Sequence, residues 1–285
     1  MSSGPEESQG ATVELSPQEE REAGRRAGLR AAVVFETVRR EGENELKRAP
    51  VALAFSGLAA GLSMGLSLVA SGMIQAALPD APWRPLATSA GYTLGFLVVI
   101  LGRQQLFTEN PVTAILPLLD DPDKGRKSIA VIRLWAIVLT TNLIGTLAFA
   151  YAVAHSRAFS EAERTAFLEL GRATLSYDFG TVFVKAIFAG WIIALLVWLL
   201  PASEGSRISV ILILTYVIGL GHLSHVIAGS AEAFYVVAAG ATTWSHYARD
   251  FLLPSFLGNS IGGVLLVSLL NYAQVAVKSE EETAK

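Results

Sequence analysis

The sequence predicts an all-α integral membrane protein with six transmembrane helices, and three observations support this fold class. Hydrophobic residues make up 52% of the 285 residues, whereas charged residues make up only 16%. A soluble domain usually carries about 25% charged residues. Six apolar stretches approach or exceed the roughly 20 residues that cross a bilayer as a helix, and turn-forming residues separate them. These features together indicate membrane helices joined by short connections.

The first 49 residues differ from the rest because they are polar and hold eight of the 22 basic residues. Residues 16–19, Ser-Pro-Gln-Glu, form a pattern that is typical of a helix start. The expected helix carries arginines and has an apolar side with Val34, Phe35 and Val38. Two interpretations stay open: a surface helix whose basic side chains bind lipid headgroups, or a gating element that covers the cytoplasmic mouth of a pore.

The apolar stretches run over residues 50–78, 86–119, 129–154, 179–200, 208–240 and 251–277. The second and fifth are too long for a single span, and polar residues interrupt them at 103–111 and 219–230. Unpaired backbone groups in hydrocarbon cost several kcal/mol each, so a broken helix is tolerated where it lines a polar cavity. We expect Asn110 and Ser230 to cap the half-helices that follow the two breaks.

The distribution of basic residues predicts that both termini lie in the cytoplasm. In that orientation fifteen Lys and Arg residues face the cytoplasm and five face the other side, as the positive-inside rule requires. The expected organisation is a cytoplasmic region over residues 1–49, a channel domain over 50–277 and a cytoplasmic tail over 278–285, in the inner membrane of the cell. The polar, acidic start gives no sign of a cleaved signal peptide.

Composition also excludes several classes of function. The chain has no cysteine, which excludes disulfides, thiolate metal sites and cysteine nucleophiles. Its net charge of −3 gives no reason to expect a nucleic-acid partner. No nucleophile paired with a base, phosphate-binding loop or credible metal cluster is recognisable. We therefore expect neither an enzyme nor a bound cofactor or metal.

An internal repeat relates the two halves of the chain. Asn-Leu-Ile-Gly at residues 142–145 and Asn-Ser-Ile-Gly at 259–262 are 117 residues apart, and the same shift relates His225 to Thr108. A unit of three spans that occurs twice must have opposite orientations, so the sequence predicts two inverted three-helix repeats with broken second and fifth helices. Such repeats place a transport site near the bilayer midplane, where half-helix N-termini favour anions.

At these residues the chain resembles the formate/nitrite transporter family. The resemblance covers about residues 50–277 and rests on Leu-Phe-Thr at 106–108, His-Val-Ile-Ala at 225–228, the helix-six run at 257–263 and the fourth stretch at 182–191. It implies an aquaporin-like fold and a homopentamer with one pore per protomer. It also implies passage of small monovalent anions of weak acids, such as formate, nitrite or hydrosulfide.

The resemblance assigns roles to particular residues. His225 matches the central pore histidine of the family, Thr108 its partner in the first break, and Asn259 a helix-six residue near that histidine. Phe107 is expected at one hydrophobic constriction, with Tyr92 and Phe96 at the other. The chain departs from the family pattern at Gly229 and Gly190, where asparagine is usual, at Ser224, and at the vestibule lysine, for which Arg172 is the nearest base.

His225 is the strongest candidate for a chemical role. An ionisable residue inside a membrane span indicates a functional site by default. An ionised anion pays a large desolvation cost in a hydrophobic slit, and its neutral acid does not. We expect His225, hydrogen-bonded to Thr108 and Asn259, to protonate the anion in transit.

Three other charged residues lie at or near the predicted breaks, and Lys185 lies one turn inside the fourth stretch. Arg103, Glu109 and Glu232 are expected either to form a structural ion pair or triad, or to attract anions and tune proton supply. Lys185 is expected either to extend to the membrane interface or to face a vestibule and concentrate anions there.

The alternative function is an aquaporin-like pore for small neutral solutes such as water or glycerol. Such pores typically carry paired Asn-Pro-Ala-like breaks. Here Asn110-Pro111 occurs once, is followed by Val112, and has no counterpart in the second break.

Overall fold

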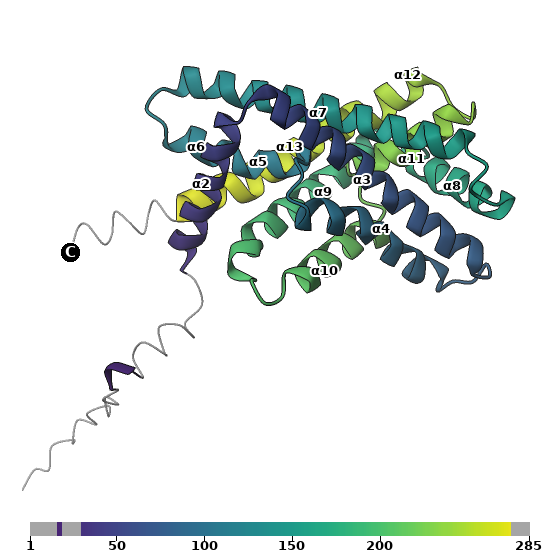
Figure 1. Ribbon diagram of the computed structural model, residues 1–285, viewed down its shortest axis with the longest axis horizontal. Coiled ribbons are helices and arrows are strands. Elements are labelled where there is room, and N and C mark those ends of the chain that lie inside the picture. Colours follow the sequence, from purple (N-terminus) through teal and green to yellow (C-terminus); the bar gives the residue numbers. More distant parts are fainter. Residues whose placement is uncertain (1–15, 19–29, 275–285) are drawn as a thin grey trace, which may run out of the picture. The chain divides into compact units, whose positions relative to one another are not determined.

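The computed structural model describes residues 16–18 and 30–274, and every regular element in this part of the chain is a helix (Figure 1). Two compact units are present, residues 1–30 and residues 31–285. Most of the helix expected to start at residues 16–19 therefore lies outside the described residues, and Pro17 and Gln18 are helical.

The second unit begins with α2 (Ala31–Lys47), α3 (Pro50–Ala77) and α4 (Arg84–Leu101). After the first break come η1 (Phe107–Glu109), α5 (Asn110–Thr113), α6 (Ile115–Asp120) and α7 (Lys124–His155). Next are α8 (Glu161–Thr174), α9 (Phe179–Leu199), η2 (Leu200–Ala202) and α10 (Arg207–Leu220). After the second break come α11 (Ala228–Ala238), α12 (Trp244–His246), η3 (Tyr247–Leu252), α13 (Leu253–Gly263) and η4 (Val264–Leu269).

Five helices in the described part are long and apolar enough to cross a membrane. They are α3, α4, α7, the helix over Phe179–Ala202 and the helix over Trp244–Gln274. The fifth predicted stretch is divided between α10, with 14 residues, and α11. Both expected interruptions are confirmed, because α4 ends at Leu101 and α10 ends at Leu220, several residues before the chain becomes helical again.

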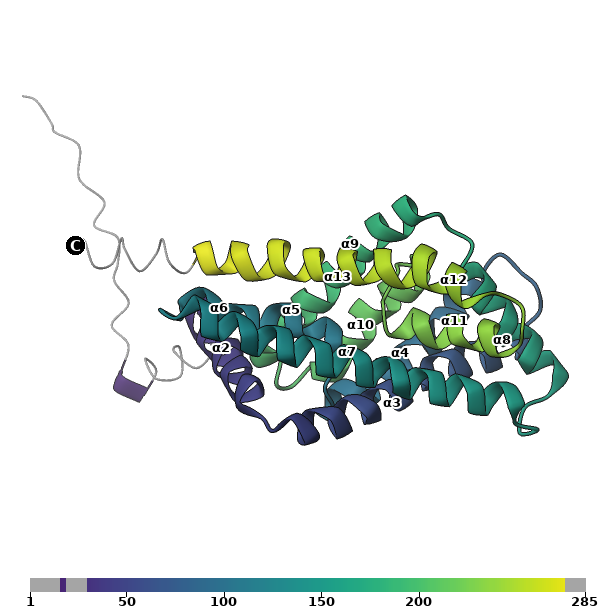
Figure 2. The same cartoon turned by 90° about the horizontal axis from the view of Figure 1, so that it is seen from above.

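The long helices pack side by side, α3 against α4 and α7, and α9 against α13 (Figure 2). The short helices after the breaks occupy the interior: all four residues of α5 are buried, as are the first nine of α11. The fold thus brings both breaks into the core of the helical unit.

The amphipathic helix α8 was not predicted, although its start carries a clear signal. Ser160 caps the helix, and its backbone N–H donates to Glu163 Oε2 at 2.7 Å, which completes a capping box. Helix α8 packs on α3 and α11, so the connection between α7 and α9 forms part of the wall of the core.

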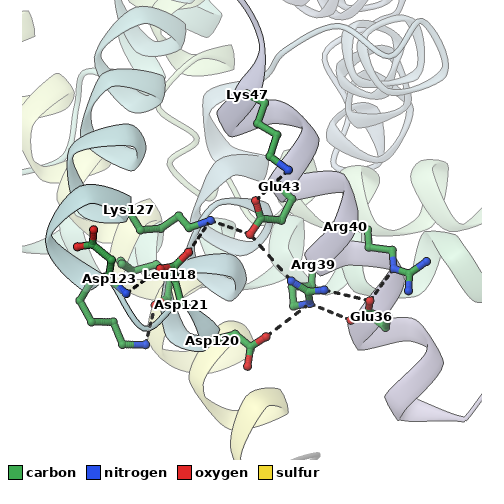
Figure 3. A network of polar contacts seen from close by, with 11 residues as sticks. Glu36, Arg39, Arg40, Glu43, Lys47, Leu118, Asp120, Asp121, Asp123 and Lys127 are labelled. Carbon is green, nitrogen blue, oxygen red and sulfur yellow. Dashed lines mark hydrogen bonds and ion pairs between the residues drawn. The ribbon is translucent and has the colours of Figure 1, made fainter.

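Helix α2 packs against protein with the apolar side that the sequence indicated. Val34, Phe35 and Val38 are buried in one cluster with residues of α5, α6 and α9. Charged residues add contacts to the connection between α6 and α7 (Figure 3). Lys127 Nζ lies 2.7 Å from Glu43 Oε1 and 2.9 Å from Asp121 Oδ2. Helix α2 is therefore attached to the channel domain along its length.

Candidate functional site

The two breaks have matching backbone geometry. Each half-helix ends at a glycine that is followed by a non-glycine residue with positive φ, Arg103 (49°) in the first break and His222 (45°) in the second. Positive φ is uncommon outside glycine, so the match is specific. These two residues are 119 positions apart, whereas Asn142 and Asn259 are 117 apart. The predicted equivalence of Thr108 with His225 is therefore wrong, because the chain from break to asparagine is two residues shorter in the second half.

Asn142 fixes the first break from α7. This residue is fully buried, and its Oδ1 accepts a hydrogen bond from the backbone N–H of Phe107 at 2.9 Å. Its Nδ2 donates to the carbonyl of Gln105 at 2.9 Å and to that of Gly57 in α3 at 2.8 Å. One amide thus satisfies two backbone groups that the broken helix leaves without partners, and it ties them to α3 through the Gly57 carbonyl.

Asn259 does the same for the second break from α13. Its Oδ1 accepts from the backbone N–H of Val226 at 2.8 Å. Its Nδ2 donates to the carbonyls of Ser224 at 2.9 Å and Ala186 at 2.7 Å. The expected bond between Asn259 and the His225 ring is therefore absent, because both Oδ1 and Nδ2 of Asn259 bond to backbone groups instead.

His225 and Thr108 come together as the sequence predicted. His225 Nε2 lies 2.8 Å from Thr108 Oγ1, and the two side chains are 0% and 1% exposed. The other ring nitrogen, Nδ1, accepts from the backbone N–H groups of Ile227 at 3.3 Å and Ala228 at 3.2 Å. Because Nδ1 is an acceptor, the neutral ring carries its proton on Nε2 and donates it to the threonine.

His225 also takes the capping role that the sequence analysis gave to Ser230. That serine lies inside α11, where its hydroxyl donates to the Val226 carbonyl and contacts Tyr247 Oη at 2.9 Å. The corresponding expectation for Asn110 is also wrong. Asn110 lies within α5, makes no capping bond, and has no partner for its Nδ2 among the described residues. In both cases the chain enters the half-helix a few residues earlier than predicted.

Aromatic rings pack around the central pair. Phe96 meets the His225 ring edge-on, with centroids 4.9 Å apart, and Tyr92 lies 5.5 Å from Phe96. Phe107 is fully buried between Trp135 and Phe256, each at 5.5 Å. The predicted aromatic residues are thus all buried, Phe96 against the His225 ring and Phe107 next to Thr108 in the sequence.

Two cavities open into the helical unit. One, the α8 vestibule, has a volume of about 140 Å³ and is lined by His225, Tyr92, Glu232 and Thr174 among others. The other, the α2 vestibule, has a volume of about 400 Å³, and its lining includes Glu109. Figures 1 and 2 place α2 and α8 at opposite ends of the unit. His225 lines the α8 vestibule and not the α2 vestibule.

The predicted triad of Arg103, Glu109 and Glu232 does not form. Arg103 is exposed, and its Nη2 lies 3.8 Å from Glu41 Oε1 of α2. Glu109 faces the α2 vestibule, whereas Glu232 faces the α8 vestibule. The two acids belong to opposite ends of the unit, and therefore no single arginine could pair with both.

Lys185 makes contacts with the second break that the sequence analysis did not anticipate. Its Nζ donates to the carbonyls of Gly221 at 3.1 Å and His222 at 3.2 Å, at the carboxyl end of α10. It also lies 4.5 Å from the centre of the Tyr177 ring. A cation at this position neutralises carbonyl groups that the broken helix leaves unpaired.

Glu45 of α2 is a vestibule residue that the sequence analysis missed. Its carboxylate accepts from Gln105 Nε2 at 3.0 Å and from Thr113 Oγ1 at 2.7 Å. Desolvation raises the pKa of the Glu45 carboxyl, and the two hydrogen bonds oppose that rise. A signal was available, because Glu45 follows Val38 and Gly42 at helical spacing on the buried face.

A model of the formate/nitrite transporter family matches residues 32–273 of the chain. The chain belongs to the formate/nitrite transporter family. It is accordingly a membrane channel or transporter for anions.

This formate/nitrite transporter is similar to the inner membrane protein YfdC of Escherichia coli (strain K12). The two are 40% identical over 264 residues, which cover 90% of this chain and 85% of YfdC. This chain is 26% identical over 240 residues to a probable formate transporter of Methanothermobacter thermautotrophicus, with 76% and 82% covered.

Solved structures share the fold of this family member. A pentameric formate channel with formate bound superposes with a TM-score of 0.68 at 19% identity, over 81% of this chain and 99% of that one. A formate/nitrite transporter (FNT) family ion channel gives 0.67 at 21% identity, over 86% and 96%. The membrane fold inferred from the sequence is therefore shared with channels of known structure.

One departure of this transporter from the family pattern has a structural cause. A Cβ atom added at Gly229 would lie 2.3 Å from Phe251 Cζ. Phe251 is 1% exposed and packs against Tyr247, so the ring has little room to move. An asparagine four residues after His225 would require a different packing of η3.

Proposed function

We propose that the chain carries small monovalent anions of weak acids, such as formate or nitrite, across the inner membrane together with protons. The proposed assembly is a homopentamer in the lipid bilayer with one pore per protomer and both termini in the cytoplasm. Family membership and the likeness to a pentameric formate channel support this proposal. The matching breaks and asparagine bonds support two inverted repeats of three helices.

The His225–Thr108 pair is the observation that carries the proposal. It is fully buried at the point where the two breaks meet, between vestibules at opposite ends of the unit. Apolar rings surround it, so an ionised anion would lose its hydration there without replacement. Phe107 is proposed for one constriction, and Tyr92 with Phe96 for the other.

The chemistry follows from the hydrogen-bond directions. Once His225 has taken a second proton on Nδ1, the contacts from Ile227 and Ala228 to that nitrogen open. The anion then receives the hydroxyl proton of Thr108, and the hydroxyl takes the Nε2 proton of the ring. The neutral acid passes and leaves His225 neutral with its proton on Nδ1. Loss of that proton to water and uptake of a proton on Nε2 then restore the form in which Nδ1 accepts from Ile227 and Ala228.

Flux in proteoliposomes tests this function. Purified protein, labelled formate or nitrite and a set pH gradient are compared with a His225→Phe variant, and His155→Phe serves as a control because His155 is exposed on α7. Uptake that follows the proton gradient and is lost only in His225→Phe is expected. Passage of water or glycerol without either anion would favour the neutral-solute pore instead.

A further inference from the structure

His225 is fully buried, and of the two vestibules it borders the α8 vestibule alone. It lines the α8 vestibule and is absent from the lining of the α2 vestibule, and Thr108 lines neither cavity. The proposed cycle requires a proton to reach His225 before each anion is neutralised. That proton must therefore enter through the α8 vestibule.

Glu232 is the only acid among the described residues that line the α8 vestibule. It lies in the second turn of α11, the helix that His225 caps, and it is 8% exposed. Thr174 Oγ1 of α8 donates to its Oε2. No hydrogen bond to Oε1 and no ion pair to either oxygen forms within residues 16–18 and 30–274. The carboxyl is thus positioned by α8 and has a free oxygen for a proton.

The basic groups around this vestibule are engaged elsewhere. Arg84 Nη2 lies 3.0 Å from Asp80 Oδ1, and Lys185 donates to backbone carbonyls. The other titratable groups that line the cavity are Tyr92, Tyr177 and His222. A buried carboxyl without a cationic partner is costly in the ionised state, which suits a group that binds and releases a proton.

We propose that Glu232 is the proton-loading group for His225, a role that rests on the proposed function. The carboxyl takes a proton from water at the mouth of the α8 vestibule. It passes that proton through vestibule water to His225 Nδ1, which leaves a carboxylate and an imidazolium. The imidazolium then gives its Nε2 proton through Thr108 to the anion. A cavity of about 140 Å³ holds several waters, so the transfer needs no direct contact between the two residues.

The test is formate flux with the pH of the two compartments set independently. The chain has no cysteine. An Arg157→Cys variant, with the new thiol in the loop between α7 and α8, can therefore be labelled with an impermeant maleimide to determine which face of the protein is outside. Wild-type flux is expected to rise as the pH on the α8 side falls. Glu232→Gln is expected to lower the flux about 10-fold or more and to abolish that dependence, whereas Glu232→Asp retains it.

Glu169→Gln is the matched control, because Glu169 is an exposed acid of α8 that does not line the cavity. If Glu232→Gln does not fold, Thr174→Val keeps the carboxyl and removes its hydrogen bond; an alkaline or acidic displacement of the pH profile is then expected. An unchanged pH profile in whichever Glu232 or Thr174 variant folds would overturn this inference and leave the proposed function standing. So would equal sensitivity to pH on both sides. A wild type that moves neither anion would instead refute the proposed function.

Discussion

Glu45 of α2 accepts a hydrogen bond from Thr113 of α5 at 2.7 Å, which joins the N-terminal helix to the half-helix after the first break. A second bond, from Gln105 Nε2, reaches the break itself. With the apolar contacts of Val34 and Phe35, these bonds make α2 a fixed wall of the α2 vestibule in this structure. Tests of these contacts therefore help to decide between the two interpretations of α2, a surface helix that binds lipid headgroups and a gating element.

Replacing Glu45 with alanine is expected to lower the free energy of unfolding by about 1–3 kcal/mol, because buried polar groups of Gln105 and Thr113 lose their acceptor. Thermal unfolding of the purified protein in detergent measures the change. Thr37→Ala is the control, because Thr37 is half-buried on the same helix and its hydroxyl donates within α2, to the Val33 carbonyl. An equal loss in both variants would argue against a specific role for the carboxylate.

The Glu45 carboxyl also predicts a pH dependence of stability. Burial raises its pKa above that in the unfolded chain, so its stabilising effect is complete below the unfolded value and is lost as pH rises through the folded value. The wild type is therefore expected to lose stability as the pH rises above the unfolded value of about 4.3, and Glu45→Gln to show a smaller loss. Parallel unfolding curves over that range would contradict this.

Close packing at Gly42 gives an independent test of α2 attachment. A Cβ atom added there would lie 1.7 Å from the Thr113 carbonyl oxygen. Gly42→Ala is therefore expected to move α2 away from α5 and to cost about 1–3 kcal/mol. Limited proteolysis near residue 49 measures the detachment, with Asn44→Ala, at an exposed position of α2, as the control. Unaltered cleavage would show that α2 tolerates the shift.

The spans and the two breaks could be predicted because each depends on local signals, whereas the contact between His225 and Thr108, 117 residues apart, was expected from the resemblance to the family. Hydropathy marks the spans, and polar residues inside an apolar run mark the breaks. The roles of Asn110 and Ser230 could not be predicted, because a cap depends on where the chain enters the half-helix. That entry point is set by the asparagine bonds from α7 and α13, which are contacts distant in sequence.

The charged residues were harder to place for the same reason. Arg103, Glu109 and Glu232 are close to the breaks in sequence, yet the fold sends Glu109 and Glu232 to opposite vestibules. The shift between the halves was misjudged because the asparagine motifs are 117 residues apart and the break residues 119 apart. The segment from the break to the asparagine differs in length between the two halves. One spacing therefore cannot relate both the breaks and the asparagines of the two repeats.

The asparagine pair predicts strong and similar effects in both halves. Asn142→Ala or Asn259→Ala would leave two buried backbone groups of a break without partners, with an expected cost of about 2 kcal/mol or more. Asn271→Ala is the control, since this asparagine makes one bond, to the Val267 carbonyl, near the end of the last described helix. Unfolding in detergent and yield of folded protein report the difference. A loss confined to one half would indicate that the two breaks are not equivalent in stability.

The tautomer of His225 can be checked directly. Nδ1 accepts from two backbone N–H groups and Nε2 lies 2.8 Å from Thr108 Oγ1, so near neutral pH we expect the ring to be neutral with its proton on Nε2. Solid-state nitrogen NMR of histidine-labelled protein resolves the ring nitrogens, and subtraction of the His225→Phe spectrum isolates one signal pair among the four histidines.

Thr108→Val should shift the Nε2 signal more than the Nδ1 signal. It should also cost about 1–3 kcal/mol of stability, because the N–H donor is then buried without an acceptor. A neutral resting ring with its proton on Nδ1 would mean that the backbone contacts to that nitrogen do not hold, and that Nε2 has no proton to give to Thr108.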